Sequence, residues 1–274
     1  MSFAEAFHLL LRPRATSSLI MVTGSPSGGV DKDKILGPEL EGEIKAICRD
    51  LLERCGAEYK IVPFSNFDLW DACWTHVQNE YHIHRDDTTG AFPKLHKYIR
   101  LGVLMADTSY AHILDLKLRV WIALFTALTT YLDDVVSSDN HHLRTFTGVL
   151  LLGRSHDHPV LNAFISFLKD MPDKFDDFIV NMVVSASMRY LMSIALEVEG
   201  KSDQISPHGR KYPGYVRSLS GMPDAYGVFA FPLHLPRSTY IQALPEVMEF
   251  VYAIKLVAAI FSVGSKYSWW LLLQ

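Results

Sequence analysis

Two adjacent aspartates, Asp133 and Asp134, follow a long apolar stretch of the sequence and are the residues that most directly suggest a chemistry. Like charges side by side repel each other and are costly to remove from water, so they persist where a cation neutralises them or where water reaches them. Hard carboxylate oxygens are ligands that magnesium favours. The pair is therefore either a magnesium site at the mouth of an apolar cavity or the frayed end of a helix in a solvated loop.

The apolar stretch before the pair, residues 110–134, predicts the helix that must position it. Its second half is apolar on nearly every side, which is typical of a helix enclosed by other helices. Further helical patterns cover residues 39–56, 160–170, 174–199, 211–229 and 237–262. Because strand-like alternation is confined to residues 59–64, the predicted fold class is all-α.

The composition is that of a globular protein with a large core, and it narrows the classes of function. The 274 residues are 49% hydrophobic and 20% charged, with a formal net charge of -4. No basic run is long enough to suggest a nucleic-acid partner. Three cysteines without a CxxC pair favour reduced thiols, and the N-terminus has no signal-peptide pattern, so we expect a cytoplasmic protein.

We expect three regions along the chain: a flexible lead-in over residues 1–36, an α-helical domain over residues 37–255 and an atypical apolar tail over residues 256–274. A membrane anchor is one explanation of the tail, because residues 250–273 are long enough to span a bilayer. Lys255 and Lys266 interrupt that run and weaken this explanation. We favour a gene-model artefact, such as translation into an unspliced intron.

A second stretch, residues 210–232, helps to decide whether the aspartate pair is a metal site. Pro213 fits the first turn of a helix, and Arg217 and Gly221 share a face because they are four residues apart. A glycine inside a helix costs about 1 kcal/mol relative to alanine. Either another group approaches the backbone at Gly221, or the helix breaks there.

These pieces, in this order, resemble the fungal class I sesquiterpene cyclases of the trichodiene synthase type. The resemblance covers about residues 60–253 and rests on LDDV after a long helix, ALEVEG, a Tyr-Pro-x-Tyr-x-Arg stretch and AYGVFAFP. It implies a class I terpenoid synthase helical bundle, with Asp133 and Asp134 as catalytic ligands of Mg2+. It also implies that Arg217 binds the substrate diphosphate and that Ser220 and Gly221 form a helix break beside it.

The chemistry of such an enzyme explains these residue types. Metal ions and a guanidinium neutralise the diphosphate, so the allylic C–O bond can ionise without a protein nucleophile. The carbocation must then be kept from water by inert or aromatic walls. The candidate cavity-lining residues are Trp121, Phe125, Tyr226 and Phe229. Ordinary core packing is the simpler explanation for any one of them.

The sequence departs from the family's metal-binding pattern in two places. Ser137 stands where a third acid is expected, and Asp139, two residues later, is a further candidate ligand. The family's second motif, an Asn followed at +4 by Ser and at +8 by Glu, has no counterpart about forty residues after Arg217. Asn181 and Ser185 have that spacing, but Arg189 replaces the acid and the trio precedes Arg217, so we interpret it as a coincidence.

Histidine clusters carry weaker signals. His82 and His84, near Asp86 and Asp87, suit a solvated loop better than a metal site. Four more histidines follow the aspartate pair and are predicted to be polar loop residues: His141, His142, His156 and His158.

The resemblance fades near residues 253–255, so we expect the bundle to be incomplete at its C-terminus. The resemblance implies one of two functions. The first is a carbon–oxygen lyase that ionises farnesyl diphosphate with Mg2+ and cyclises it to a sesquiterpene. The second is a catalytically inactive homologue or a nonenzymatic binder of prenyl diphosphate. A helical interaction protein unrelated to the family is a third reading of the same pattern.

Overall fold

In the computed structural model, most of the described residues between 64 and 261 form α-helices. The structure describes residues 64–81, 95–134, 140–200, 211–220, 222–231 and 235–261, and single helical positions at Gly42, Ala46, Arg49, Asp50 and Glu53. It describes the backbone alone at residues 140, 200, 213, 214, 217 and 253–261. No strand occurs in these ranges, and the predicted all-α class is confirmed.

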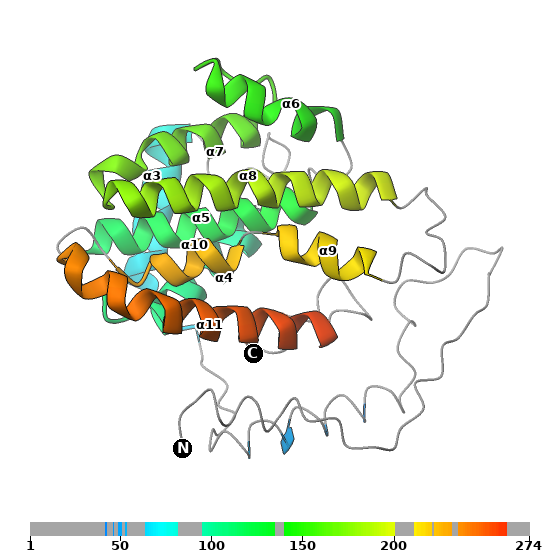
Figure 1. The fold of residues 1–274 in the computed structure, drawn as a ribbon. Helices are drawn as coiled ribbons and strands as arrows, with labels where there is room; N and C mark the ends of the chain where they lie inside the picture. The colour runs from blue at the N-terminus through cyan, green and yellow to red at the C-terminus, as the bar shows by residue number, and fades with distance from the viewer. Residues whose placement is uncertain are drawn as a thin grey trace. The chain divides into compact units, whose positions relative to one another are not determined.

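Figure 1 shows the helices of the described residues. Their bounds are α3 Phe67–Tyr81, α4 Leu95–Ser109, α5 Leu116–Asp134, α6 Asn140–Leu151, α7 Pro159–Lys169, a 3-10 turn at Met171–Asp173, α8 Asp177–Gly200, α9 Tyr212–Leu219, α10 Met222–Val228 and α11 Arg237–Phe261. Sequence patterns predicted α7, α8 and α11 to within a few residues. They did not predict α3, α4 or α6.

One compact unit runs from Pro63 to Leu256. A second unit combines Met1–Val62 with Val257–Gln274. The predicted lead-in lies outside the described residues, as do residues 262–274 of the predicted tail and most of the helix predicted at residues 39–56, whereas residues 256–261 belong to α11. The boundaries proposed for these segments therefore stay predictions.

The helix that carries the aspartate pair begins later than predicted. Residues 110–115 form a turn, and the side chain of Asp115 accepts hydrogen bonds from the backbone N–H groups of Lys117 at 2.8 Å and Leu118 at 3.4 Å. A carboxylate in this position satisfies N–H groups that have no partner within the helix and so marks its start. The prediction that the helix begins at residue 110 was wrong because this cap was not recognised.

Helices α4 and α5 cross at very close range at Gly102. A Cβ atom at this position would overlap the backbone carbonyl oxygen of Ala123 and would lie 2.8 Å from its carbonyl carbon. Only glycine lets the two backbones meet in this way. Because α5 is buried along most of its length, this contact helps to fix the helix that ends in the aspartates.

The single helix predicted over residues 211–229 is two helices. Helix α9 ends at Leu219 and α10 begins at Met222, whose backbone N–H donates to the carbonyl of Ser220 at 2.6 Å. Both short helices pack against α8, which contacts α6 elsewhere along its length (Figure 1). The interruption coincides with the position where a glycine in the sequence predicted a break.

Helix α8 is the one helix, within the described residues, that is long and apolar enough to cross a membrane by length and composition alone. Its contacts with α6, α9 and α10 cover part of this apolar surface.

Candidate functional site

The two aspartates end α5, and α4 holds one of them in place. The Tyr98 hydroxyl donates a hydrogen bond to a carboxylate oxygen of Asp134 at 3.0 Å. The Lys97 ammonium group lies 3.7 Å from the same oxygen. The Asp134 side chain is only 14% exposed, so these two partners offset much of the cost of burying its charge. Asp133 is partly exposed.

A hydrogen bond from α8 and a ring contact from α10 connect these helices to α5. The Tyr190 hydroxyl of α8 donates to the carbonyl of Thr129 at 2.6 Å, one turn before Asp133. The ring of Tyr226 in α10 meets that of Phe125 in α5 edge-to-face, with centroids 6.4 Å apart. Burial raises the pKa of Tyr190 well above its usual value, and the nearby negative charge of Asp133 raises it further. Tyr190 therefore remains a neutral hydrogen-bonding group.

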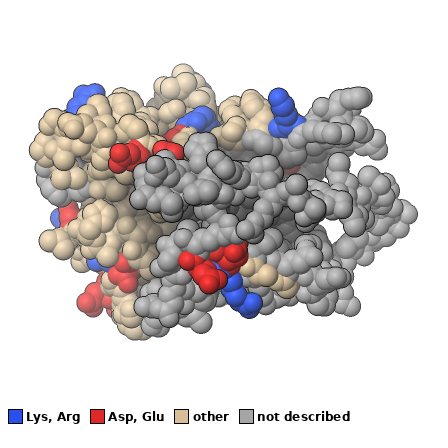
Figure 2. Space-filling model, turned by 60° about the horizontal axis from the view of Figure 1, so that its bottom comes forward, with Lys and Arg blue, Asp and Glu red and all other residues tan. Residues whose placement is uncertain are grey.

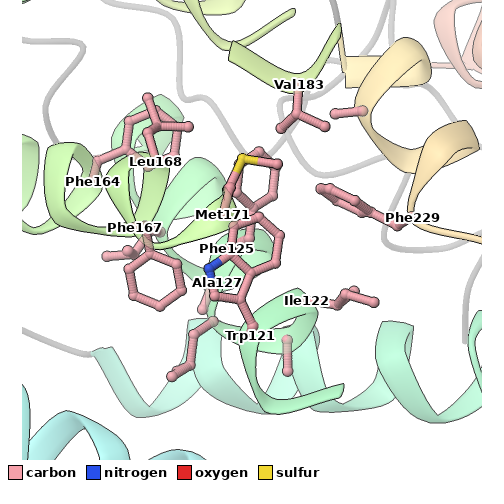
Figure 3. Close-up of a cluster of buried hydrophobic side chains, with 14 of the residues drawn as sticks. Trp121, Ile122, Phe125, Ala127, Phe164, Phe167, Leu168, Met171, Val183 and Phe229 are labelled. Atoms are coloured by element: carbon pink, nitrogen blue, oxygen red, sulfur yellow. The ribbon is translucent and has the colours of Figure 1, made fainter. Parts of the chain in front are cut away.

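Aromatic rings from α5 and its neighbours pack together in the core (Figure 3). Trp121 stacks on Phe125 with ring centroids 5.3 Å apart, and Phe229, the residue after α10, meets Phe125 edge-to-face at 5.1 Å. Tyr226 lies 5.8 Å from Phe229. The structure thus brings all four candidate lining residues together. In this arrangement their rings pack against one another, and a role in lining a substrate cavity stays a prediction.

The same region contains an apolar void between α3, α4, α5 and α7. Seven side chains line it: Val77, Tyr81, Leu95, Leu124, Ala127, Leu128 and Phe167. None of them is among the residues predicted to face the substrate. The void has no polar lining, so it offers nothing that would bind a diphosphate.

An ion pair between a buried acid and a partly exposed arginine, which sequence reasoning missed, lies beside the helix break. Asp224, in the first turn of α10, pairs with Arg189 of α8 and accepts a hydrogen bond from the Tyr252 hydroxyl of α11 at 2.6 Å. In the sequence, Arg189 stands where a metal motif beginning with Asn181 and Ser185 would have an acid. The structure gives Arg189 an acidic partner 35 residues away, which spacing alone could not reveal.

The donor set at the end of α5 suits magnesium better than a metal that needs a complete protein cage. Magnesium is commonly bound through one or two carboxylates together with waters and substrate phosphates. Within the described ranges, no group of three or more His, Cys, Asp or Glu side chains could hold a metal ion. Two adjacent carboxylates fit a magnesium ion that a diphosphate helps to bind.

The structure leaves other predicted site residues undescribed. The backbone of residue 217 lies in α9, but the placement of the Arg217 side chain lies outside the description. Gly221 and Asp139 lie outside the described residues, as do His82 and His84. Ser220 is partly buried directly after α9. The roles suggested for these residues remain predictions.

The prediction that the later histidines are polar loop residues was wrong for His141 and His142, which lie in the first turn of α6. His156 is 7% exposed, its Nδ1 atom accepts the backbone N–H of His158 at 3.0 Å, and its Nε2 atom lies 3.1 Å from the carbonyl of His142. Burial lowers the pKa of His156, so the neutral ring joins the start of α6 to the segment before α7.

Charged side chains occur in small groups on the face shown in Figure 2. Acidic and basic groups are interspersed among the described atoms of that face. An arrangement of this kind produces no extended field of one sign across that part of the surface.

Comparison with known proteins identifies relatives of one kind. Over 210 residues the chain is 42% identical to the alpha-cuprenene synthase COP6 of Coprinopsis cinerea, covering 76% of this chain and 63% of that one. Over 239 residues it is 26% identical to monoterpene synthase 25 of Postia placenta, covering 86% and 70%. It is 24% identical over 146 residues to an (E)-beta farnesene synthase of Metarhizium brunneum, covering 53% and 42%. No family model matches the chain.

Proposed function

Because the homologues of this chain are fungal terpene synthases, we propose that it is a class I terpene cyclase. In this proposal it ionises farnesyl diphosphate with Mg2+, closes the resulting cation to a sesquiterpene and releases diphosphate. The observation that carries the proposal is the aspartate pair at the end of α5, a helix whose earlier turns lie in a core of packed aromatic rings. The chain spans 63% of the length of the Coprinopsis protein, so its own activity needs a direct test.

The aspartate end of α5 supplies the polar half of the proposed site. When bound, Mg2+ would neutralise charge on the diphosphate, so that the allylic C–O bond can ionise. Tyr98 and Lys97 hold the Asp134 carboxylate in one orientation, and Asp133 is exposed enough to meet a ligand. A fixed carboxylate needs little reorganisation when the ligand arrives, which favours ionisation.

The aromatic side chains supply the apolar half. Trp121, Phe125 and Phe229 are buried and present no hydroxyl or amine that could trap a cation. Aromatic faces attract a positive charge through their quadrupole, and close packing excludes water. Entry of the hydrocarbon chain requires these rings to separate, so we expect the packed arrangement to open when substrate binds.

The relatives narrow the choice of substrate. Those named as an alpha-cuprenene synthase and an (E)-beta farnesene synthase support farnesyl diphosphate. The one named as a monoterpene synthase makes geranyl diphosphate the substrate to test beside it. Both substrates share the allylic diphosphate that the aspartate pair would recognise through magnesium.

The test is to incubate the purified 274-residue chain with each diphosphate and Mg2+ and to identify extractable hydrocarbons by gas chromatography and mass spectrometry. We expect a cyclic product from farnesyl diphosphate that disappears when EDTA is added. Loss of one charge-stabilising group typically lowers turnover about 100-fold, so we expect that loss for Asp133→Asn. Asp173→Asn, at an exposed aspartate outside the site, is the matched control.

Two results would change the conclusion. Magnesium-dependent binding of diphosphate without any hydrocarbon product would favour the nonenzymatic binder. The absence of both diphosphate binding and hydrocarbon product would contradict a diphosphate site on this chain.

A further inference from the structure

The buried carboxylate of Asp224 has no part in the chemistry described above. Asp224 is 8% exposed and lies in the first turn of α10. One of its oxygens pairs with the guanidinium group of Arg189, and the other accepts the hydroxyl hydrogen of Tyr252 at 2.6 Å. Its partners belong to α8 and α11. One carboxylate therefore connects three helices.

Packing alone gives no reason for an acid at this position. Replacing a buried ion pair with well-packed apolar residues is often neutral or even stabilising. A carboxylate whose two oxygens are both bound fixes the orientation of its helix, because its hydrogen bonds are satisfied only in one orientation of that helix. In α10, a helix of 7 residues, such a carboxylate fixes the rotation of the helix about its axis.

Helix α10 contacts α5, which carries the aspartate pair, and it directly follows the break after α9. Two residues after Asp224, the ring of Tyr226 meets that of Phe125 in α5 edge-to-face, with centroids 6.4 Å apart. The backbone carbonyl of Tyr226 accepts the hydroxyl hydrogen of Tyr110 at 2.6 Å. At its other end, α10 follows directly on the break after α9, the helix that carries residue 217.

Close packing also ties α10 to α11 downstream of Asp224. A Cβ atom added at Gly227 would lie 2.9 Å from the methyl carbon of Met248. Tyr252 is four residues beyond Met248 on the same helix, one turn further along. Helix α11 therefore contacts α10 through both the carboxylate and the glycine.

We propose that Asp224, held by Arg189 and Tyr252, is a positioning residue for the cyclisation reaction. It fixes α10 against α8 and α11, so that Tyr226 keeps its contact with α5, the helix that ends in the aspartate pair, and the α9–α10 break keeps its geometry. This inference rests on the proposed function. Asp224 acts through α10 and does not contact the substrate.

Kinetic analysis of matched variants tests this role. Asp224→Asn should lower kcat for farnesyl diphosphate about tenfold, which corresponds to about 1.4 kcal/mol of transition-state stabilisation. We expect little change in KM, together with a broader set of products, because a loosened α10 no longer fixes the aspartate end. Arg189→Lys should retain more activity than Arg189→Met, since a cation remains to pair with the acid. Asp170→Asn, which removes an exposed ion pair with Lys174 at 2.7 Å, should leave kcat unchanged.

Tyr252→Phe keeps the test valid if the charge variants fold poorly. It removes one hydroxyl group from a side chain that is 42% exposed, so folding should be preserved. We expect a smaller fall in kcat, in the same direction as for Asp224→Asn. Unchanged kcat and products in both Tyr252→Phe and the folded fraction of Asp224→Asn would overturn the proposal and leave the trio a purely structural contact.

Hydrogen–deuterium exchange provides a readout that needs no activity. In Asp224→Asn we expect faster exchange at residues 126–134 and 211–220, with α3 and α7 unchanged. Faster exchange confined to α10 would contradict coupling to the site. If the wild-type chain forms no product and binds no magnesium diphosphate, the proposed function fails, whereas exchange still decides whether Asp224 controls the end of α5.

Discussion

Asp133 and Asp134 are neighbours at the end of α5, and both are partly exposed. The Asp134 carboxylate is fixed by the Tyr98 hydroxyl at 3.0 Å and by Lys97 at 3.7 Å. The sequence predicted the pair from its charge and its position after an apolar helix. It could not predict the two partners, because α4 is brought to α5 only by tertiary packing.

Replacing Tyr98 with phenylalanine tests the value of this orientation. A hydrogen bond to a charged group contributes about 1.5–3 kcal/mol, so Tyr98→Phe should lower kcat/KM by about tenfold or more. We also expect a higher Mg2+ concentration at half-maximal rate. Tyr240→Phe is the control, since it removes a similar phenol–carboxylate bond, 2.7 Å to Asp176, away from the aspartate pair. An identical magnesium dependence in wild type and Tyr98→Phe would contradict the assigned role.

The buried His156 predicts a specific dependence of stability on pH. Burial lowers its pKa below the usual value of 6.5, so the folded chain holds it neutral while the unfolded chain protonates it in mild acid. Protonation then favours the unfolded chain, and the contribution of His156 to stability is lost as the pH falls below about 6.5. We expect Tm to fall between pH 7.5 and pH 5.5, and to fall less in His156→Gln. Equal falls in the two proteins would show that another group, such as His76, controls the effect.

At the scale of helices, the sequence was most informative where the periodic pattern is long and apolar. It predicted α7, α8 and α11, and a glycine indicated the break between α9 and α10. It placed the start of α5 six residues too early because the Asp115 cap was not recognised. Helices α3, α4 and α6 were missed, since their apolar residues alternate with many polar ones and gain their core face only from neighbouring helices.

The α4–α5 crossing makes a prediction about Gly102. A Cβ atom there would lie 2.8 Å from the carbonyl carbon of Ala123, so Gly102→Ala must push the two backbones apart. Overpacking of this kind typically costs about 1–3 kcal/mol. Because Tyr98 in α4 and Asp134 in α5 would separate, activity should fall together with Tm.

Gly148 in α6 provides the matched control for Gly102. A Cβ atom at Gly148 has no other atom within 4 Å. Alanine is better than glycine in an open helix by about 1 kcal/mol, so Gly148→Ala should raise Tm. Thermal melts of both variants separate close packing from helix propensity. Equal tolerance of the two substitutions would contradict the close crossing of α4 and α5.

At the scale of the whole molecule, aromatic contacts join α5, α7 and α10 around Phe125. Its ring lies 5.1 Å from that of Phe229 and 5.6 Å from that of Phe164. Removing a buried phenylalanine side chain typically costs about 3–5 kcal/mol, so Phe125→Ala should strongly lower the free energy of unfolding. Leu151→Ala, at a side chain that is 81% exposed, should change it little. Denaturant titration measures both effects, and a small loss in Phe125→Ala would mean that this core is loosely packed.

Binding of inorganic diphosphate, measured by calorimetry with and without Mg2+, tests the central claim most directly. That claim is that the aspartate end of α5 is a magnesium-dependent diphosphate site. We predict saturable binding only in the presence of Mg2+, weakened about tenfold or more in Asp133→Asn, because that substitution removes one anionic ligand. The control Asp173→Asn should bind as the wild type does. Binding that is independent of Mg2+, or equally tight in Asp133→Asn, would contradict the assignment.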